Sequence, residues 1–90
     1  MSKVTDNAIA GRYELEEQGE IAYADYRLHP GMLIIDYVFS PVPLRGKGTS
    51  ARLMAGVVAD AREKGLKITP LCGYAAAWIK RHPAASELLA

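Results

Sequence analysis

The chain has 90 residues, of which 50% are hydrophobic and 23% are charged, and this composition excludes a disordered, collagen-like or multidomain protein. Cys72 is the single cysteine, so an internal disulfide is excluded, and no cluster of Cys and His predicts a metal site. Residues 1–40 carry three Lys/Arg against seven Asp/Glu (−4), and residues 41–90 carry eight against three (+5), so the C-terminal half suits a polyanionic partner.

The N-terminal stretch from Met1 to Ala10 lacks the apolar run of a signal peptide or a membrane span. Together with the lone cysteine, it leads us to expect a cytoplasmic protein with no membrane partner. We also expect a single domain over residues 1–90, near the small end of what folds without disulfides or metals.

The first half of the chain predicts strands. Residues 12–28 alternate aromatic and branched side chains with polar ones, and the polar run 16–20 predicts a turn between two strands. The segment 28–31, Leu-His-Pro-Gly, predicts a second turn, because Pro fixes φ at the first central position and Gly accepts a positive φ at the next. The mostly apolar run 32–39 predicts a strand that is buried on both faces.

The second half predicts a strand between two helices. Pro41 and Pro43 end the preceding strand, and residues 47–64 then form an amphipathic helix that ends at Gly65. A short strand over 66–71 and a second helix over 74–81, ended by Pro83, follow. The apolar stripe of the first helix is predicted to contain Ala51, Met54, Val57, Val58 and Ala61.

The predicted order is therefore β-β-β-α-β-α, an antiparallel meander followed by a strand-helix-strand unit. Such an order specifies an α+β fold with a mixed sheet and a right-handed crossover.

The loop from Arg45 to Ser50, Arg-Gly-Lys-Gly-Thr-Ser, lies between a predicted strand and the start of a helix. Glycines let the backbone approach a ligand, and the first amides of a helix have no internal partners and lie at its positive end. The loop therefore predicts a phosphate cradle, to which Arg45 and Lys47 add positive charge. It matches neither GxxxxGK[ST] nor GxGxxG, which excludes two common nucleotide-binding loops.

The loop resembles the motif [RQ]xxGx[GA] of the GNAT acetyltransferase superfamily through Arg45 and Gly48, and it departs from the motif at Ser50. The flanking residues are similar in order and spacing to a group of very small, single-domain GNAT-like proteins. The segments that carry this resemblance are 43–48, 53–54, 61–62, 65–68, 70–72 and 81–83.

The resemblance implies an acetyl-CoA-dependent N-acetyltransferase that acts on a primary amine of a small molecule or peptide. It also implies that two strands splay apart around the pantetheine arm and that a backbone amide near Ser40 polarises the acetyl carbonyl. The cofactor-binding residues expected are Ser40, Pro41, Val42, Arg45, Gly46, Lys47, Gly48, Thr49, Ser50, Cys72 and Tyr74.

The catalytic groups are less defined. The resemblance places Cys72 where it could relay the acetyl group, but no neighbouring His or cluster of cations would make it a thiolate, which favours a small buried apolar role. Relatives often carry an acidic residue just before the loop, whereas Tyr37 to Ser40 contains none and Asp36 is the nearest carboxylate. His82, at the end of the last helix, could touch the cofactor or acceptor, or simply favour the helix terminus.

Two other functions stay open. The missing carboxylate favours a non-catalytic acyl-CoA-binding module, and the basic half prompts a nucleic-acid-binding protein, although no aromatic residues interleave with its basic ones. The partners expected are acetyl-CoA and an amine acceptor, without nucleic acid, for a monomer or a homodimer.

Overall fold

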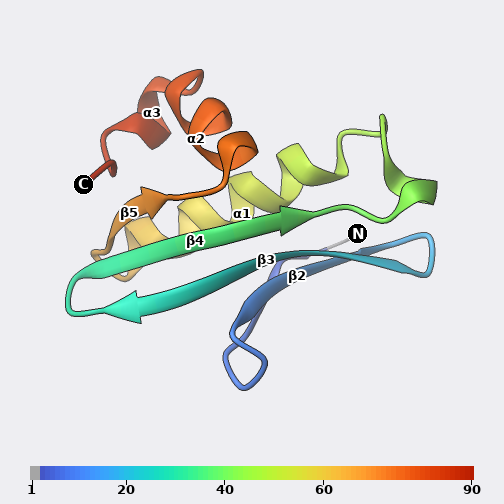
Figure 1. Cartoon of the computed structure of the whole chain (residues 1–90), viewed down its shortest axis with the longest axis horizontal. Helices are drawn as coiled ribbons and strands as arrows, with labels where there is room; N and C mark the ends of the chain where they lie inside the picture. Colours follow the sequence, from blue (N-terminus) through green and yellow to red (C-terminus); the bar gives the residue numbers. More distant parts are fainter. Residues whose placement is uncertain (1–2) are drawn as a thin grey trace.

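The protein, described here by a computed structural model, forms one five-stranded sheet with helices packed against it (Figure 1). The structure describes residues 3–90; Met1 and Ser2, which the expected domain and N-terminal stretch include, lie outside the described residues. The strands are β1 (Thr5–Asn7), β2 (Arg12–Glu17), β3 (Glu20–His29), β4 (Met32–Phe39) and β5 (Lys67–Pro70). Their spatial order is β1-β2-β3-β4-β5, antiparallel up to β4 and parallel between β4 and β5. The α+β fold with a mixed sheet is confirmed.

The helices follow β4. They are the 3₁₀-helix η1 (Val42–Leu44), then α1 (Thr49–Glu63), α2 (Gly73–Lys80) and α3 (Pro83–Ser86). Helix α1 runs along the sheet, while α2 and α3 lie together beside β5 (Figure 1). Gly65 follows α1 with a φ of 70°, as expected for the residue that ends a helix. Within residues 3–90, no helix has both the length and the apolar character needed to cross a membrane.

Three features differ from the sequence prediction. Strand β1 was not expected, because Thr-Asp-Asn has no apolar alternation, and it exists by pairing with β2. Helix α2 ends before Pro83 as predicted, but helix α3 was not expected: Pro83 is its first residue, where the missing N–H costs nothing. Strand β4 is buried on one face only: Leu33 and Ile35 are fully buried, whereas Tyr37, which a register shift against β3 places on the opposite face, is 51% exposed.

One hydrophobic cluster joins the sheet to the helices. Four of the five residues of the stripe predicted for α1 are buried, and Ala51 is half-buried beside them. The largest side chains of the cluster that are fully buried are Tyr13, Leu15, Leu33, Ile35, Leu53, Met54, Val57, Ile68 and Ile79. Since these come from β2, β4, β5, α1 and α2, the position of α1 on the sheet is set by apolar packing.

Hydrogen bonds also connect α1 to the sheet near the end of α1. The Tyr13 hydroxyl donates to Asp60 Oδ2 at 2.5 Å, and Lys64 Nζ donates to Asp6 Oδ2 at 3.1 Å. Burial is the main cause that raises the pKa of Tyr13, and the Asp60 carboxylate raises it further, so this hydroxyl keeps its proton.

The C-terminal residues close part of the outer edge of β5. Ile68 N–H donates to the Leu88 carbonyl at 2.7 Å, and Ala90 N–H donates to the Ile68 carbonyl at 3.0 Å. Both backbone groups that Ile68 presents at this edge are therefore satisfied by the chain's own tail.

Candidate functional site

The loop between β4 and α1 turns sharply at two glycines. Gly46 and Gly48 both have a φ of 78°, a left-handed conformation that glycine adopts without steric cost. Gly48 is the N-cap residue of α1, and no side chain caps this end of the helix. The helix begins at Thr49, two residues later than the predicted start at Lys47. The loop and the start of the helix thus adopt the strand-turn-helix arrangement that the sequence indicates.

Several backbone amides of this loop have no hydrogen-bond acceptor. Within residues 3–90, no group accepts a hydrogen bond from the amides of Gly46, Gly48, Thr49 or Ser50. Since two of these amides open a helix of 15 residues, they lie at the positive end of its dipole. Such a set of donors suits an anion such as a phosphate.

A pocket of about 240 Å³ lies against these amides. It brings together seven of the residues that the sequence assigned to cofactor binding. Its lining consists of Ser40, Leu44, Arg45, Gly46, Gly48, Thr49, Ser50, Ala51 and Tyr74. The loop and the first turn of α2 therefore share one hollow.

Two further polar groups belong to this pocket. The Ser40 Oγ atom is buried and has no hydrogen-bond partner within the described part of the chain. An unpaired buried hydroxyl is costly unless a ligand or water satisfies it. Arg45 donates from Nε to the Ser40 carbonyl at 3.0 Å, and its exposed guanidinium keeps other donors available. Both residues add hydrogen-bonding capacity to the side of the pocket next to β4.

Strands β4 and β5 separate before β4 reaches this pocket. Their last paired residues are Ile35 and Pro70, and the last bond between them joins Leu71 N–H to the Ile35 carbonyl at 2.9 Å. From there to Phe39, the described residues pair β4 with β3 alone. One edge of β4 is therefore unpaired where it leads to Ser40.

Four of the assigned residues do not line the pocket. Lys47 points to the other side of the loop, where its Nζ donates to Gln18 Oε1 at 3.1 Å. Val42 is exposed in η1, which Pro41 precedes. Cys72 is half-buried against the hydrophobic cluster, just before α2. Of the four, Cys72 thus has the packing expected of a small apolar residue.

The ionisable side chains that line the pocket are Arg45 and Tyr74. Partial burial raises the pKa of Tyr74, and the positive charge of Arg81 lowers it to a smaller extent. Tyr74 therefore holds its proton at neutral pH. No carboxylate and no histidine is among the lining residues. The described pocket therefore offers no carboxylate or imidazole that could act as a general base.

Two candidate bases lie elsewhere. Asp36 accepts from Arg27 Nε and Nη2, each at 2.8 Å, and these hydrogen bonds lower its pKa, which makes it a weaker base. The His82 ring stacks on Trp78 with centroids 3.8 Å apart, in a separate apolar hollow between α1 and the segment from α2 to α3. His82 therefore does not line the loop pocket. No group of three or more His, Cys, Asp or Glu within residues 3–90 is arranged to hold a metal ion.

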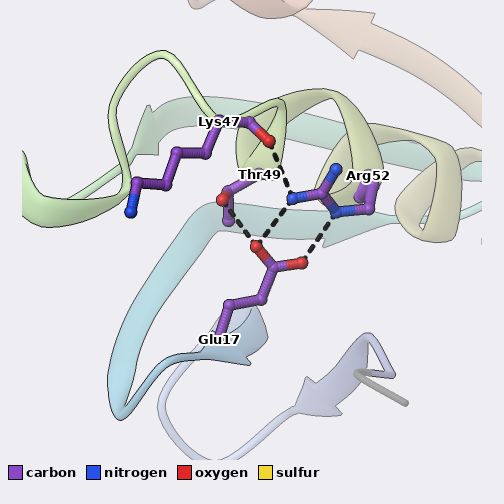
Figure 2. A network of polar contacts seen from close by, with 4 residues as sticks. All are labelled: Glu17, Lys47, Thr49 and Arg52. Carbon is purple, nitrogen blue, oxygen red and sulfur yellow. Dashed lines mark hydrogen bonds and ion pairs between the residues drawn. The ribbon is translucent and has the colours of Figure 1, made fainter.

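A polar network beneath the loop, shown in Figure 2, has no counterpart among the features expected from the sequence. Glu17, at the end of β2, accepts from Thr49 Oγ1 at 2.6 Å, Arg52 Nε at 2.7 Å and Arg52 Nη2 at 2.8 Å. Arg52 Nη2 also donates to the Lys47 carbonyl at 2.9 Å. A separation of 35 residues hides this pairing, and the only signal in the sequence is the opposite charge of the two halves.

The hydrogen bonds from Arg52, and then that from Thr49, lower the pKa of Glu17 from 4.5 to about 2. A carboxyl with a depressed pKa in the folded state stabilises the fold fully above its ordinary pKa, and this contribution disappears as the pH falls through the folded value. We therefore expect the stability difference between wild type and Glu17→Gln to be larger at about pH 5 than at about pH 3. Denaturant unfolding at both pH values measures it, and a difference that does not shrink on acidification would contradict the assignment.

Comparisons with known proteins cover almost the whole chain. A family model described as GCN5-related N-acetyl-transferase matches residues 12–88. A solution structure of a GCN5-like candidate N-acetyltransferase from Staphylococcus aureus has a similar fold, with a TM-score of 0.70 and 20% sequence identity, over 98% of this chain and 87% of that chain. Among curated proteins, no significant match is found. The residues that the family model matches include the whole loop from Arg45 to Ser50.

Proposed function

Since this chain belongs to the GCN5-related N-acetyltransferase family, we propose that it binds acetyl-CoA and transfers the acetyl group to a primary amine of a small molecule or peptide. The observation that carries the proposal is the set of unpaired amides at the start of α1, which lies against a pocket and follows two glycines of left-handed φ. A cytoplasmic location, in reach of acetyl-CoA, is part of the same proposal.

The loop would hold the diphosphate group of the cofactor. The amides of Gly48, Thr49 and Ser50 provide donors at the positive end of α1, and Arg45 provides a guanidinium that can grip two oxygens. The short side chain of Ser50, where the family motif has Gly or Ala, leaves the backbone accessible. The unpaired Ser40 hydroxyl would gain a partner from the bound molecule.

The unpaired edge of β4 would receive the pantetheine arm. An amide-containing arm can bond to exposed strand backbone as an added strand would. The separation of β5 from β4 after Pro70 supports this placement, because it exposes that edge.

When bound, acetyl-CoA supplies a thioester whose carbonyl carbon is open to attack by an amine. Direct transfer forms a C–N bond and breaks the C–S bond; the amine loses a proton, and the departing thiolate must gain one. Tyr74 is the lining residue whose hydroxyl holds a proton at neutral pH and from which that proton would come. Because the described lining offers no base, the amine would enter in its neutral form or lose its proton to water. A relay through Cys72 is disfavoured, because Cys72 packs against the hydrophobic cluster.

The lack of a base in the lining also supports a second candidate, a non-catalytic acyl-CoA-binding module. Calorimetry with acetyl-CoA, CoA and dephospho-CoA, combined with CoA release in the presence of a panel of primary amines, distinguishes the two. We expect all three to bind with similar affinity, because the proposed contacts are to the diphosphate and not to the 3′-phosphate. Binding with amine-dependent turnover in wild type and in Cys72→Ala supports direct transfer. Binding without turnover supports the module, and no binding of any of the three would refute both.

A further inference from the structure

The peptide group between Lys47 and Gly48 is anchored on one side. The Lys47 carbonyl accepts from Arg52 Nη2 at 2.9 Å. In a planar trans peptide, the N–H of the next residue points opposite to the carbonyl. The anchor that holds the Lys47 carbonyl toward Arg52 therefore directs the Gly48 amide away from Arg52.

That opposite direction is the side of the pocket. Gly48 lines the pocket, whereas Lys47 and Arg52 do not. Rotation of this peptide changes ψ of Lys47 and φ of Gly48, and glycine adopts positive and negative φ about equally well. Without an anchor, this peptide would therefore rotate at little cost, and it would then present a carbonyl to the pocket in place of an amide.

Arg52 is itself fixed by the sheet. Its guanidinium makes a two-pronged ion pair with Glu17, whose side chain is 13% exposed, and Glu17 also accepts from Thr49, which is almost fully buried. A fork that meets a carboxylate with two bonds is geometrically specific. Glu17 ends β2, so the chain of contacts runs from the sheet through Arg52 to the loop (Figure 2).

We propose that Glu17 and Arg52 are positioning residues, which hold the 47–48 peptide so that the Gly48 amide faces the anion in the pocket. The identity of that anion as the diphosphate group of CoA rests on the function proposed above. If Glu17 acted only through its charge, its removal would tighten binding, because a carboxylate close to an anion site repels the anion. The direction of the change in affinity therefore separates the two roles.

The test compares Glu17→Gln and Arg52→Lys with Arg27→Lys. Lysine keeps the positive charge at position 52 but cannot form the fork to Glu17 while bonding to the Lys47 carbonyl. Arg27 is a matched control, because it makes the same kind of two-pronged pair with Asp36, and its side chain is 55% exposed against 54% for Arg52. By calorimetry with CoA, we expect about a tenfold loss of affinity in Glu17→Gln and Arg52→Lys, the effect of one lost charge-assisted hydrogen bond, and no loss in Arg27→Lys.

Nitrogen-15 relaxation of the ligand-free proteins gives a readout that does not depend on the cofactor. The order parameters of the Gly46 and Gly48 amides should fall in Glu17→Gln and Arg52→Lys and stay at the wild-type value in Arg27→Lys. CoA affinity that is unchanged or higher in both site variants would overturn the proposal. If wild type binds no CoA, the proposed function fails, and the order parameters decide the positioning role: unchanged values overturn it, and lower values support it.

Discussion

Replacing Gly48 with Asp should abolish CoA binding, by at least about 100-fold or roughly 2.7 kcal/mol, while the protein stays folded. The new carboxylate would stand at the N-terminus of α1, beside the pocket that Gly48 lines, where its charge would repel a diphosphate. Its Cβ would lie 3.1 Å from Arg52 Nη1, a contact that a shift of a few tenths of an ångström relieves. The left-handed φ costs a residue with a side chain about 1–2 kcal/mol, which a folded domain tolerates. Calorimetry with CoA measures the loss of affinity, and circular dichroism shows whether the protein stays folded.

Gly31→Asp is the matched control for this substitution. Gly31 has a φ of 70°, lies in the turn before β4 at the end opposite to the loop, and has no heavy atom within 4 Å of an added Cβ. The control introduces the same charge and a similar backbone strain, and we expect it to bind CoA as wild type does. Unchanged affinity in Gly48→Asp, or an equal loss in Gly31→Asp, would show that the loop does not hold the cofactor.

Replacing Leu53 with Ala should destabilise the protein by about 2–5 kcal/mol, the cost of a cavity left by a buried Leu. Leu53 is fully buried in the hydrophobic cluster, one residue after Arg52 in α1. Domains are stable by about 5–15 kcal/mol, with small ones near the lower end, so this loss removes a large share of the stability. Urea unfolding followed by circular dichroism measures the free energy of unfolding.

Leu28→Ala is the matched control, because it makes the same substitution at a residue that is 59% exposed, near the end of β3. The same atoms are deleted there without leaving a cavity, and we expect a loss of less than about 1 kcal/mol. Equal losses in the two variants would contradict the view that apolar packing of α1 sets its place on the sheet.

The fold was predictable where local patterns were strong. The alternation over 12–28, the Pro-Gly turn and the periodicity of α1 predicted β2, β3, β4 and α1 to within two residues. Strand β1 was missed because its three polar residues gain their structure only by pairing with β2. The one-sided burial of β4 was missed because an apolar run does not reveal that helices cover a single face of the sheet.

The loop before α1 could be predicted from the sequence, but the contacts that hold the loop in place could not. Two glycines and the start of a helix are local signals, and they led to Gly46, Gly48 and the amides that follow. Lys47 was assigned by charge alone, whereas its side chain bonds to Gln18 on the opposite side of the loop. The Glu17 carboxylate joins two segments far apart in the chain, and no local pattern in a single sequence reports such a contact.

The pairing of the C-terminal tail with Ile68 bears on aggregation. An incoming strand could lengthen the sheet at β5 only by displacing Leu88 and Ala90 from the backbone groups that they already occupy. The opposite border of the sheet is β1, which has three residues and therefore offers few positions for docking. Edge-to-edge growth of the sheet into fibres is thus hindered at Ile68 of β5, by the C-terminal tail, and at β1, by its shortness.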